Sequence, residues 1–405
     1  SANAAGTGAF TIPAMKKFGM PPEHAASIEA IASSGGQIMP PILGATAFVM
    51  CDFLGMHFVE ILYASIFGSL IFFGSTMLSV HFIAKRFITS DHSDSNPFID
   101  DFKKRLTLQY ILQGLPIFIC LIVLLYVFIV YQVNILLGGF CTAISFLIVR
   151  FIYDSIAGKF RYDFIVSYTK NLKNGVILGA TMMISIELML ACLGIIIRVM
   201  TTTGLAEKIS YAMVTTFGNH FFILLFFTMI ICIVFGMAVS TVAAYILVVT
   251  LAAPALIKIG VDPLAAHFSV FYWAMLSAFT PPVAAACVIT SGIARSGFIK
   301  TCWEAMKLGL PKFIMPIIFI RYPEILSLTF KGFIAFLISS VGFIALSAGI
   351  QSNWGILPQV LLLVLGIFIL FIPYNFFTWF LIILTSFFFL YFWYRYNVNN
   401  VVLSP

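Results

Sequence analysis

Charged residues are scarce in this sequence: Asp, Glu, Lys and Arg together make up 9% of the chain, whereas hydrophobic residues make up 61%. A soluble domain is nearer half apolar and a quarter charged, so this chain cannot cover itself with a polar surface in water. The composition therefore predicts an all-α integral membrane protein, and the lipid bilayer is its first expected partner.

Short cysteine spacings, metal-ligand pairs and catalytic motifs are also missing. The seven cysteines include no C-x-x-C and the six histidines no H-x-x-x-H, which argues against a disulfide framework and a metal site. The sequence has no G-x-S-x-G, no H-E-x-x-H and no glycine-rich phosphate loop. We therefore expect no enzyme activity and no cofactor.

A long basic tract is missing too, so the net charge of +7 does not indicate nucleic-acid binding. Fourteen of the 22 Lys and Arg fall in three regions between apolar runs, namely 85–105, 150–173 and 295–312. Such clustering is typical of the cytoplasmic loops of membrane proteins.

Apolar runs long enough to cross the bilayer as helices are present throughout the chain. We predict spans at 60–83, 109–131, 133–153, 176–200, 219–235, 309–320 with its flanks, 332–350, 354–373 and 374–394. The turn at 131–134 makes the second and third spans a tight antiparallel pair. The predicted organisation is a first repeat unit (1–84), basic loops with the helix pair (85–175), a second repeat unit (176–325) and a C-terminal helical extension (326–405).

Two stretches, 1–50 and 236–292, do not fit simple spans, because Gly, Pro, Ser, Thr and Asn interrupt their apolar sequence. They match without gaps at one offset, 281 − 40 = 241. The matched pairs of prolines and glycines are Pro13 with Pro254, Gly19 with Gly260, Pro22 with Pro263, Pro40 with Pro281, and Pro41 with Pro282. Each unit predicts a hairpin, a Pro-capped helix and a Pro-Pro break. Paired broken helices are the sequence sign of a secondary-transporter binding site.

The distribution of charge favours an inverted repeat. If 85–105 and 150–173 are cytoplasmic, the 295–312 cluster is also cytoplasmic only when 203–217 makes one further short crossing. We expect that crossing, and with it two units of opposite orientation.

Polar groups gather at the two breaks. Small hydroxyls, amides and freed carbonyls are ligands that suit sodium, and half-helix N-termini favour an anion. The alternative is that Gly and Ser merely let helices pack closely. Glu187, in the same apolar run as Arg198, is a possible intramembrane charge that faces a cavity or pairs with another helix.

At these residues the chain resembles a known family. The segments SANAAGTGAFTIPAMKKFG, ASSGGQIMPPILGATAF, GMAVSTVAAYILVVTLAAPAL, AAHFSVFYWAMLSAFTPPVAAA and SGIARSGF are similar to the large permease subunit of TRAP transporters. The similarity covers roughly residues 1–325. It is greatest to the fused permeases that work with TAXI-type binding proteins.

The resemblance implies an elevator-type secondary transporter in the bacterial inner membrane, with sodium as the coupling ion and a small organic anion as substrate. A periplasmic substrate-binding protein would deliver that anion. The resemblance further implies that both breaks line the ion and substrate region, through Ser1, Asn3, Gly35, Gly36, Pro40, Pro41, Gly236, Thr241, Ser277, Thr280, Pro281 and Pro282.

The family's motif begins before Ser1, so we expect a small-subunit portion and the first arm of the first hairpin in another chain or upstream. The alternative to transport is a non-transporting membrane scaffold or an inactive truncated permease.

Overall fold

The computed structural model describes residues 2–41, 43–87, 108–131, 135–156, 162–217, 220–237, 240–372 and 376–402. Within these ranges the chain is helical and contains no strand. Five of the described helices are long and apolar enough to cross a membrane: 58–87, 136–153, 241–258, 330–351 and 377–395. The prediction of an all-α membrane protein is confirmed.

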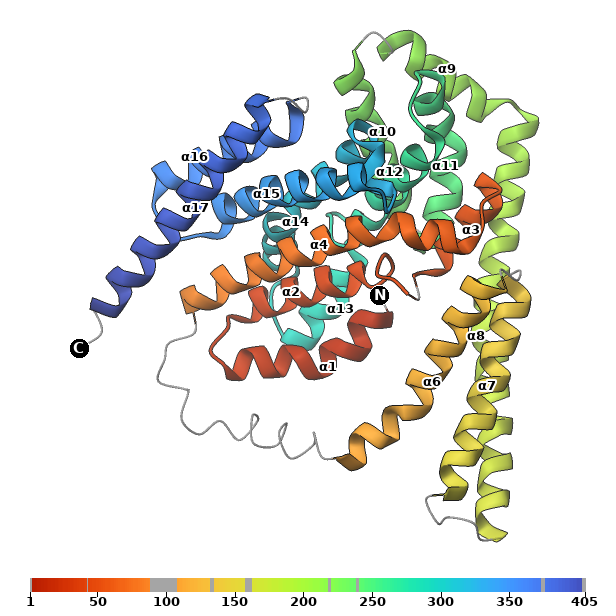
Figure 1. The fold of residues 1–405 in the computed structure, drawn as a ribbon. Coiled ribbons are helices and arrows are strands. Elements are labelled where there is room, and N and C mark those ends of the chain that lie inside the picture. The colour runs from red at the N-terminus through yellow and green to blue at the C-terminus, as the bar shows by residue number, and fades with distance from the viewer. Residues whose placement is uncertain are drawn as a thin grey trace. The chain divides into compact units, whose positions relative to one another are not determined.

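The chain forms two compact units (Figure 1). One comprises residues 55–60 and 92–203 and the other the remainder. The first of these contains α6 (Leu108–Val130), α7 (Ile135–Ile156) and α8 (Tyr162–Thr202). Helices α6 and α7 pack on each other as a pair. The tight turn predicted for this pair lies mostly outside the described residues, as do the loop 89–105 and part of the loop 150–173.

Helix α8 is longer than the predicted span at 176–200. It has 41 residues, which at the helical rise makes it about 60 Å long, roughly twice the hydrocarbon thickness. Its first half contains the polar sequence from Tyr162 to Asn174. The predicted span is thus the apolar half of a continuous helix.

The larger unit contains the two repeats. The first consists of α1 (Ala2–Lys17), α2 (Pro22–Gly35), α3 (Ala45–Leu54) and α4 (Phe58–Phe87). The second consists of α11 (Thr241–Lys258), α12 (Pro263–Leu276), α13 (Ala285–Ala294) and α14 (Phe298–Arg321), preceded by α9 (Leu205–Phe217) and α10 (Phe221–Gly236). At the offset of 241, α2 and α12 coincide at both ends, and α1 and α11 end at equivalent lysines.

The backbone repeats as well. Gly19 and Gly260, which follow the hairpin helices α1 and α11, have φ 89° and 92°, and Leu43 and Ala284 have φ 54° and 41°. A left-handed backbone is where glycine costs least, which explains the matched glycines. The offset seen in the sequence is thus a repeat of structure.

The two broken helices run in opposite directions. Helix α2 packs on α13, and α3 packs on α12. The first half of each broken helix thus packs on the second half of the other. Two antiparallel broken helices produce this pairing, whereas two parallel ones would pair α2 with α12. The hairpin helices follow the same exchange, since α1 contacts α13 and α11 contacts α3. The repeat is therefore inverted. The 13-residue α9, which covers the predicted extra crossing, is shorter than the roughly 20 residues that a span needs.

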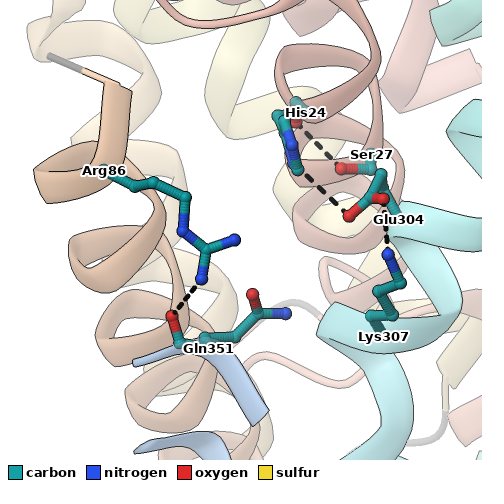
Figure 2. Close-up of polar contacts among 6 residues, drawn as sticks. All are labelled: His24, Ser27, Arg86, Glu304, Lys307 and Gln351. Carbon is teal, nitrogen blue, oxygen red and sulfur yellow. Dashed lines mark hydrogen bonds and ion pairs between the residues drawn. The ribbon is translucent and has the colours of Figure 1, made fainter. Parts of the chain in front are cut away.

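Polar contacts connect the ends of helices that are far apart in sequence (Figure 2). His24 Nδ1, in the first turn of α2, lies 3.5 Å from Glu304 Oε2 of α14, and Glu304 also pairs with Lys307 at 2.8 Å. On α4, Arg86 Nη2 donates to the carbonyl of Gln351 at 2.9 Å. This last contact connects the first repeat to the C-terminal helices.

Those C-terminal helices are α15 (Phe330–Gln351), α16 (Ile356–Phe371) and α17 (Phe376–Val402), which follow the short 3₁₀ helix η2 (Pro323–Leu326). Helix α15 packs on α14 as well as on α16 and α17. The ammonium of Lys85 lies 4.7 Å from the ring centroid of Trp393, which connects α4 to α17. Residues 326–405 thus pack against the repeats.

Candidate ion and substrate site

The first break separates α2 from α3 over residues 36–44. The peptide bond between Pro40 and Pro41 is cis, and both prolines are half-buried. Prolines cannot donate a backbone hydrogen bond, so the loop closes elsewhere: Gly44 N donates to the carbonyl of Gln37 at 2.8 Å. The break is therefore an ordered loop with a carbonyl-rich backbone.

The side chain of Asn3 reaches this break from α1. Its Nδ2 donates to the carbonyl of Ser33 at 3.2 Å. A Cβ on Gly36 would lie 3.0 Å from that same nitrogen, so the absence of a side chain there gives Asn3 its place. On the other side of α2, a Cβ on Gly35 would lie 2.4 Å from the ring of Phe72. Asn3 and Gly36 thus meet at the break, while Gly35 lets α4 pack closely behind it.

The second break has the same backbone with a different polar environment. The peptide bond between Pro281 and Pro282 is cis. Ser277 Oγ donates to the carbonyl of Ala274 at 2.6 Å, and Thr280 Oγ1 donates to the carbonyl of Leu276 at 2.8 Å. Both hydroxyls therefore bond to carbonyls of their own helix and still offer lone pairs.

The tip of the second hairpin, between α10 and α11, lies against this break. A Cβ on Gly236, the last residue of α10, would lie 2.7 Å from Ser277 Oγ. Thr241 begins α11, and Ser240 caps that helix by accepting from Ala243 N. Of the predicted set, Asn3 thus meets Gly36 at the first break, and Gly236 meets Ser277 at the second. Ser1 lies outside the described residues.

A buried carboxylate that the predicted set does not include lies about two turns before the first break. The side chain of Glu29 in α2 is held by hydroxyls from two helices, and Glu29 is only 5% exposed. Thr7 and Thr11 of α1 donate to its Oε1 and Oε2, and Ser33 Oγ donates to Oε1 at 2.7 Å. Among the described residues, no Lys, Arg or His forms an ion pair with Glu29.

The sequence does contain a signal for this cluster. Asn3, Thr7 and Thr11 follow one another at intervals of four residues, as do Glu29 and Ser33. Residues four apart share a helix face, so two facing polar stripes can be read from the sequence. Thr7 was recognisable as a polar residue of the hairpin, but Glu29 in the run IEAIASS does not reveal by itself which side of α2 it occupies.

A second buried charge is Lys312 of α14. It belongs both to the basic region 295–312 and to the predicted span at 309–320, and it is 1% exposed. Its Nζ lies 3.3 Å from the carbonyl of Leu308 and 3.4 Å from Ser75 Oγ, and 5.1 Å from the ring centroid of Phe72. Helix α14 continues through this residue and packs it against α4.

Glu187 lies in the other compact unit, within α8, and its side chain is exposed. It belongs to the same helix as Arg198, so the two are fixed about three turns apart.

A cavity of about 530 Å³ lies between α4, α15 and α17. Its lining is apolar apart from Ser75, His81 and Ser340. Such a lining suits a hydrocarbon chain better than a small anion. No group of three metal-ligating His, Cys, Asp or Glu occurs in the part of the chain that the structure describes. The breaks and Glu29 are therefore the candidate places for an ion or a small anion in the repeats.

Comparison with known families gives one match. A family model described as the DctM component of the tripartite ATP-independent periplasmic transporter matches residues 1–325. That range covers both repeats and ends before α15. No curated protein matches the chain significantly.

Proposed function

The chain belongs to the DctM family of TRAP transporters. We propose that it is a permease subunit that uses a sodium gradient to drive the import of a small organic anion. The observation that supports this proposal best is the antiparallel pair of broken helices, α2–α3 and α12–α13, each with a hairpin helix packed across it. In a transporter with two inverted repeats, the repeats can exchange conformations. The polar region at their breaks then opens to one side of the membrane in one state and to the other side in the second state.

The chemistry at the breaks suits an anion and a hard cation together. Helices α3 and α13 both begin directly behind a break, and α13 has no side-chain cap on its first turn. The free N–H groups of such helix ends attract negative charge. The hydroxyls of Ser277 and Thr280 and the open carbonyls of the loops supply oxygen to sodium. A small carboxylate or an acidic amino acid fits this combination.

The hairpins and broken helices would form the moving part in an elevator-type cycle. TRAP systems of this family operate with a periplasmic binding protein and a small membrane subunit. We therefore place this chain in the inner membrane of a bacterium, where the binding protein passes its anion to the breaks. The C-terminal helices α15–α17 lie outside the family match.

The test is uptake into proteoliposomes that contain the chain with its small subunit and its binding protein. Radiolabelled succinate and glutamate are the first probes, followed by any carboxylate that the binding protein retains. We expect accumulation that needs both the binding protein and an inward sodium gradient. Uptake that is indifferent to the sodium gradient would contradict the coupling.

A non-transporting scaffold is the competing function, and it predicts that the wild-type assembly accumulates no carboxylate. If the wild type does accumulate one, the double variant Gly36→Val with Gly236→Val tests whether the breaks carry the transport. Side chains at these positions would meet Asn3 and Ser277, so the variant should lose uptake while its partners still bind.

A further inference from the structure

The buried carboxylate of Glu29 needs an explanation, because a charge inside a membrane domain is costly unless it is neutralised. Three hydroxyls donate to it, from Thr7 and Thr11 of α1 and from Ser33 on its own helix. These bonds satisfy the carboxylate oxygens but supply no positive charge. The described residues supply no cationic side chain that pairs with it.

The second repeat provides an internal control for whether the fold needs these polar groups. At the offset of 241 the five members of the cluster correspond to apolar residues. The pairs are Asn3 with Ala244, Thr7 with Val248, Thr11 with Ala252, Glu29 with Val270, and Ser33 with Ala274. All five apolar partners are buried. The same pair of helices therefore packs in this protein with apolar residues at all five of these positions.

We propose that Glu29, Thr7, Thr11 and Ser33 form a sodium site in the first repeat. The site supplies a carboxylate and three hydroxyl oxygens, which are the ligands that hard cations prefer. It rests on the proposed sodium coupling and assigns the ion to a place about two turns before the break, in the first repeat alone.

The two threonine hydroxyls can change from donors to ligands without losing a hydrogen bond. Thr7 Oγ1 lies 2.8 Å from the carbonyl of Asn3, and Thr11 Oγ1 lies 3.1 Å from the carbonyl of Thr7. Each threonine can turn its proton to this carbonyl and give its lone pairs to the ion. The backbone of α1 therefore supplies acceptors that replace the carboxylate when sodium binds.

The ion also has a route to the carboxylate and a reason to affect the break. Thr7 and Thr11 are exposed, so Glu29 is reached from the α1 side. Ser33 connects the site to the break, because its carbonyl accepts from Asn3. Gly8 holds α1 close, since a Cβ there would lie 3.2 Å from Cγ of Glu29 and 3.4 Å from Ile293 of α13. Sodium would thus draw α1 onto α2 and α13.

Binding of ²²Na⁺ by the purified full chain tests the site directly, with choline as the inert ion and potassium as the competitor. We expect saturable binding that weakens at least tenfold in Glu29→Gln and Glu29→Val, and several-fold in Thr7→Val. The control variants are Glu23→Gln, on the same helix but outside the cluster, and Thr46→Val, a buried hydroxyl in α3. Both should bind as the wild type does.

Glu29→Val should fold as the wild type does, since Val270 occupies the equivalent place, and elution profile and thermal unfolding check this. Unchanged ²²Na⁺ binding in Glu29→Gln would overturn the site, and so would the absence of binding to the wild type. If uptake is driven by sodium but Glu29→Gln still binds sodium normally, the site is overturned and the proposed function is not. Uptake indifferent to sodium would overturn the proposed function instead.

Discussion

The two repeats share a backbone but not a chemistry. Helices α2 and α12 start and end at equivalent residues, both breaks contain a cis Pro-Pro bond, and Gly19 and Gly260 have φ values within a few degrees. Yet the five positions of the Glu29 cluster, between the hairpin helix and the broken helix, are polar in the first unit and apolar in the second. The difference teaches that the fold depends on helix ends and packing, whereas the polar residues are free to serve a ligand.

The second unit has a polar pair of its own in a different place. Tyr245 and His267 lie 2.7 Å apart between α11 and α12, where the first unit has Ala4 and Ala26. Both alanines are completely buried. Each unit thus carries a polar contact that the other does without, so neither contact is a requirement of the repeat.

The largest effect should come from moving the carboxylate to the wrong unit. In Val270→Glu the new side chain would meet Val248, Ala252 and Ala274, none of which can donate to it. A charge at the centre of a membrane helix costs about 3 kcal/mol. We expect loss of monodisperse protein on size exclusion, whereas Glu29→Val remains folded.

A rescue experiment on Val270→Glu tests whether the second unit rejects any buried carboxylate or lacks only the hydroxyls that would donate to it. Adding Val248→Thr, Ala252→Thr and Ala274→Ser would recreate the cluster of the first unit. The fourfold variant should recover folded protein and bind a second equivalent of ²²Na⁺. A fourfold variant no better folded than Val270→Glu would show that the two interfaces differ in more than these side chains.

The comparison also shows what a single sequence reveals. Prolines and glycines act through their own backbone, so Pro40, Pro41 and Gly19 allowed the repeat, its offset and its breaks to be predicted from the sequence, and hydropathy indicated the spans. Glu29 acts through Thr7 and Thr11, 22 and 18 residues away. The burial of Glu29 depends on how α1 packs on α2, and the local sequence around Glu29 does not reveal that packing.

Lys312 shows the same limit. It belongs to the basic region 295–312 and also to the predicted span at 309–320, so the local pattern leaves its surroundings open. Helix α14 runs on for nine residues beyond Lys312 and buries it against α4. The surroundings of a charged residue thus depend on the tertiary packing of its helix.

The next largest effect is expected at Gly35, where the two units pack differently. The equivalent residue is Leu276, whereas a Cβ on Gly35 would lie 2.4 Å from the ring of Phe72 and 2.9 Å from that of Phe73. Overpacking of this kind costs about 1–3 kcal/mol. Gly35→Ala should lower the thermal unfolding midpoint and weaken uptake. Gly74→Ala, on α4 with open space around it, is the matched control.

A smaller effect should appear at the start of the broken helices. Asp262 caps α12 by accepting from Ala265 N at 3.0 Å, but α2 has Pro21 at the equivalent place and no side-chain cap. Loss of such a cap costs about 1 kcal/mol. Asp262→Ala should therefore lower the unfolding midpoint by a few degrees, and Asp262→Asn should restore most of it. Equal midpoints for the two variants would show that α12 does not depend on its cap.

The smallest effect concerns the two contacts of Glu304 in α14, one within its own helix and one to α2 of the first unit. Glu304 pairs with Lys307, whose side chain is 58% exposed, and lies 3.5 Å from His24, whose side chain is 12% exposed. An exposed pair contributes at most about 0.5 kcal/mol because water screens it. Lys307→Gln should leave the unfolding midpoint within about 1 °C of the wild type. Glu304→Gln should lower it further, since the second unit has Ala265 where the first has His24 and offers no substitute contact. If both variants unfold alike, the His24–Glu304 contact does not hold α2 on α14, and apolar packing does so in both units.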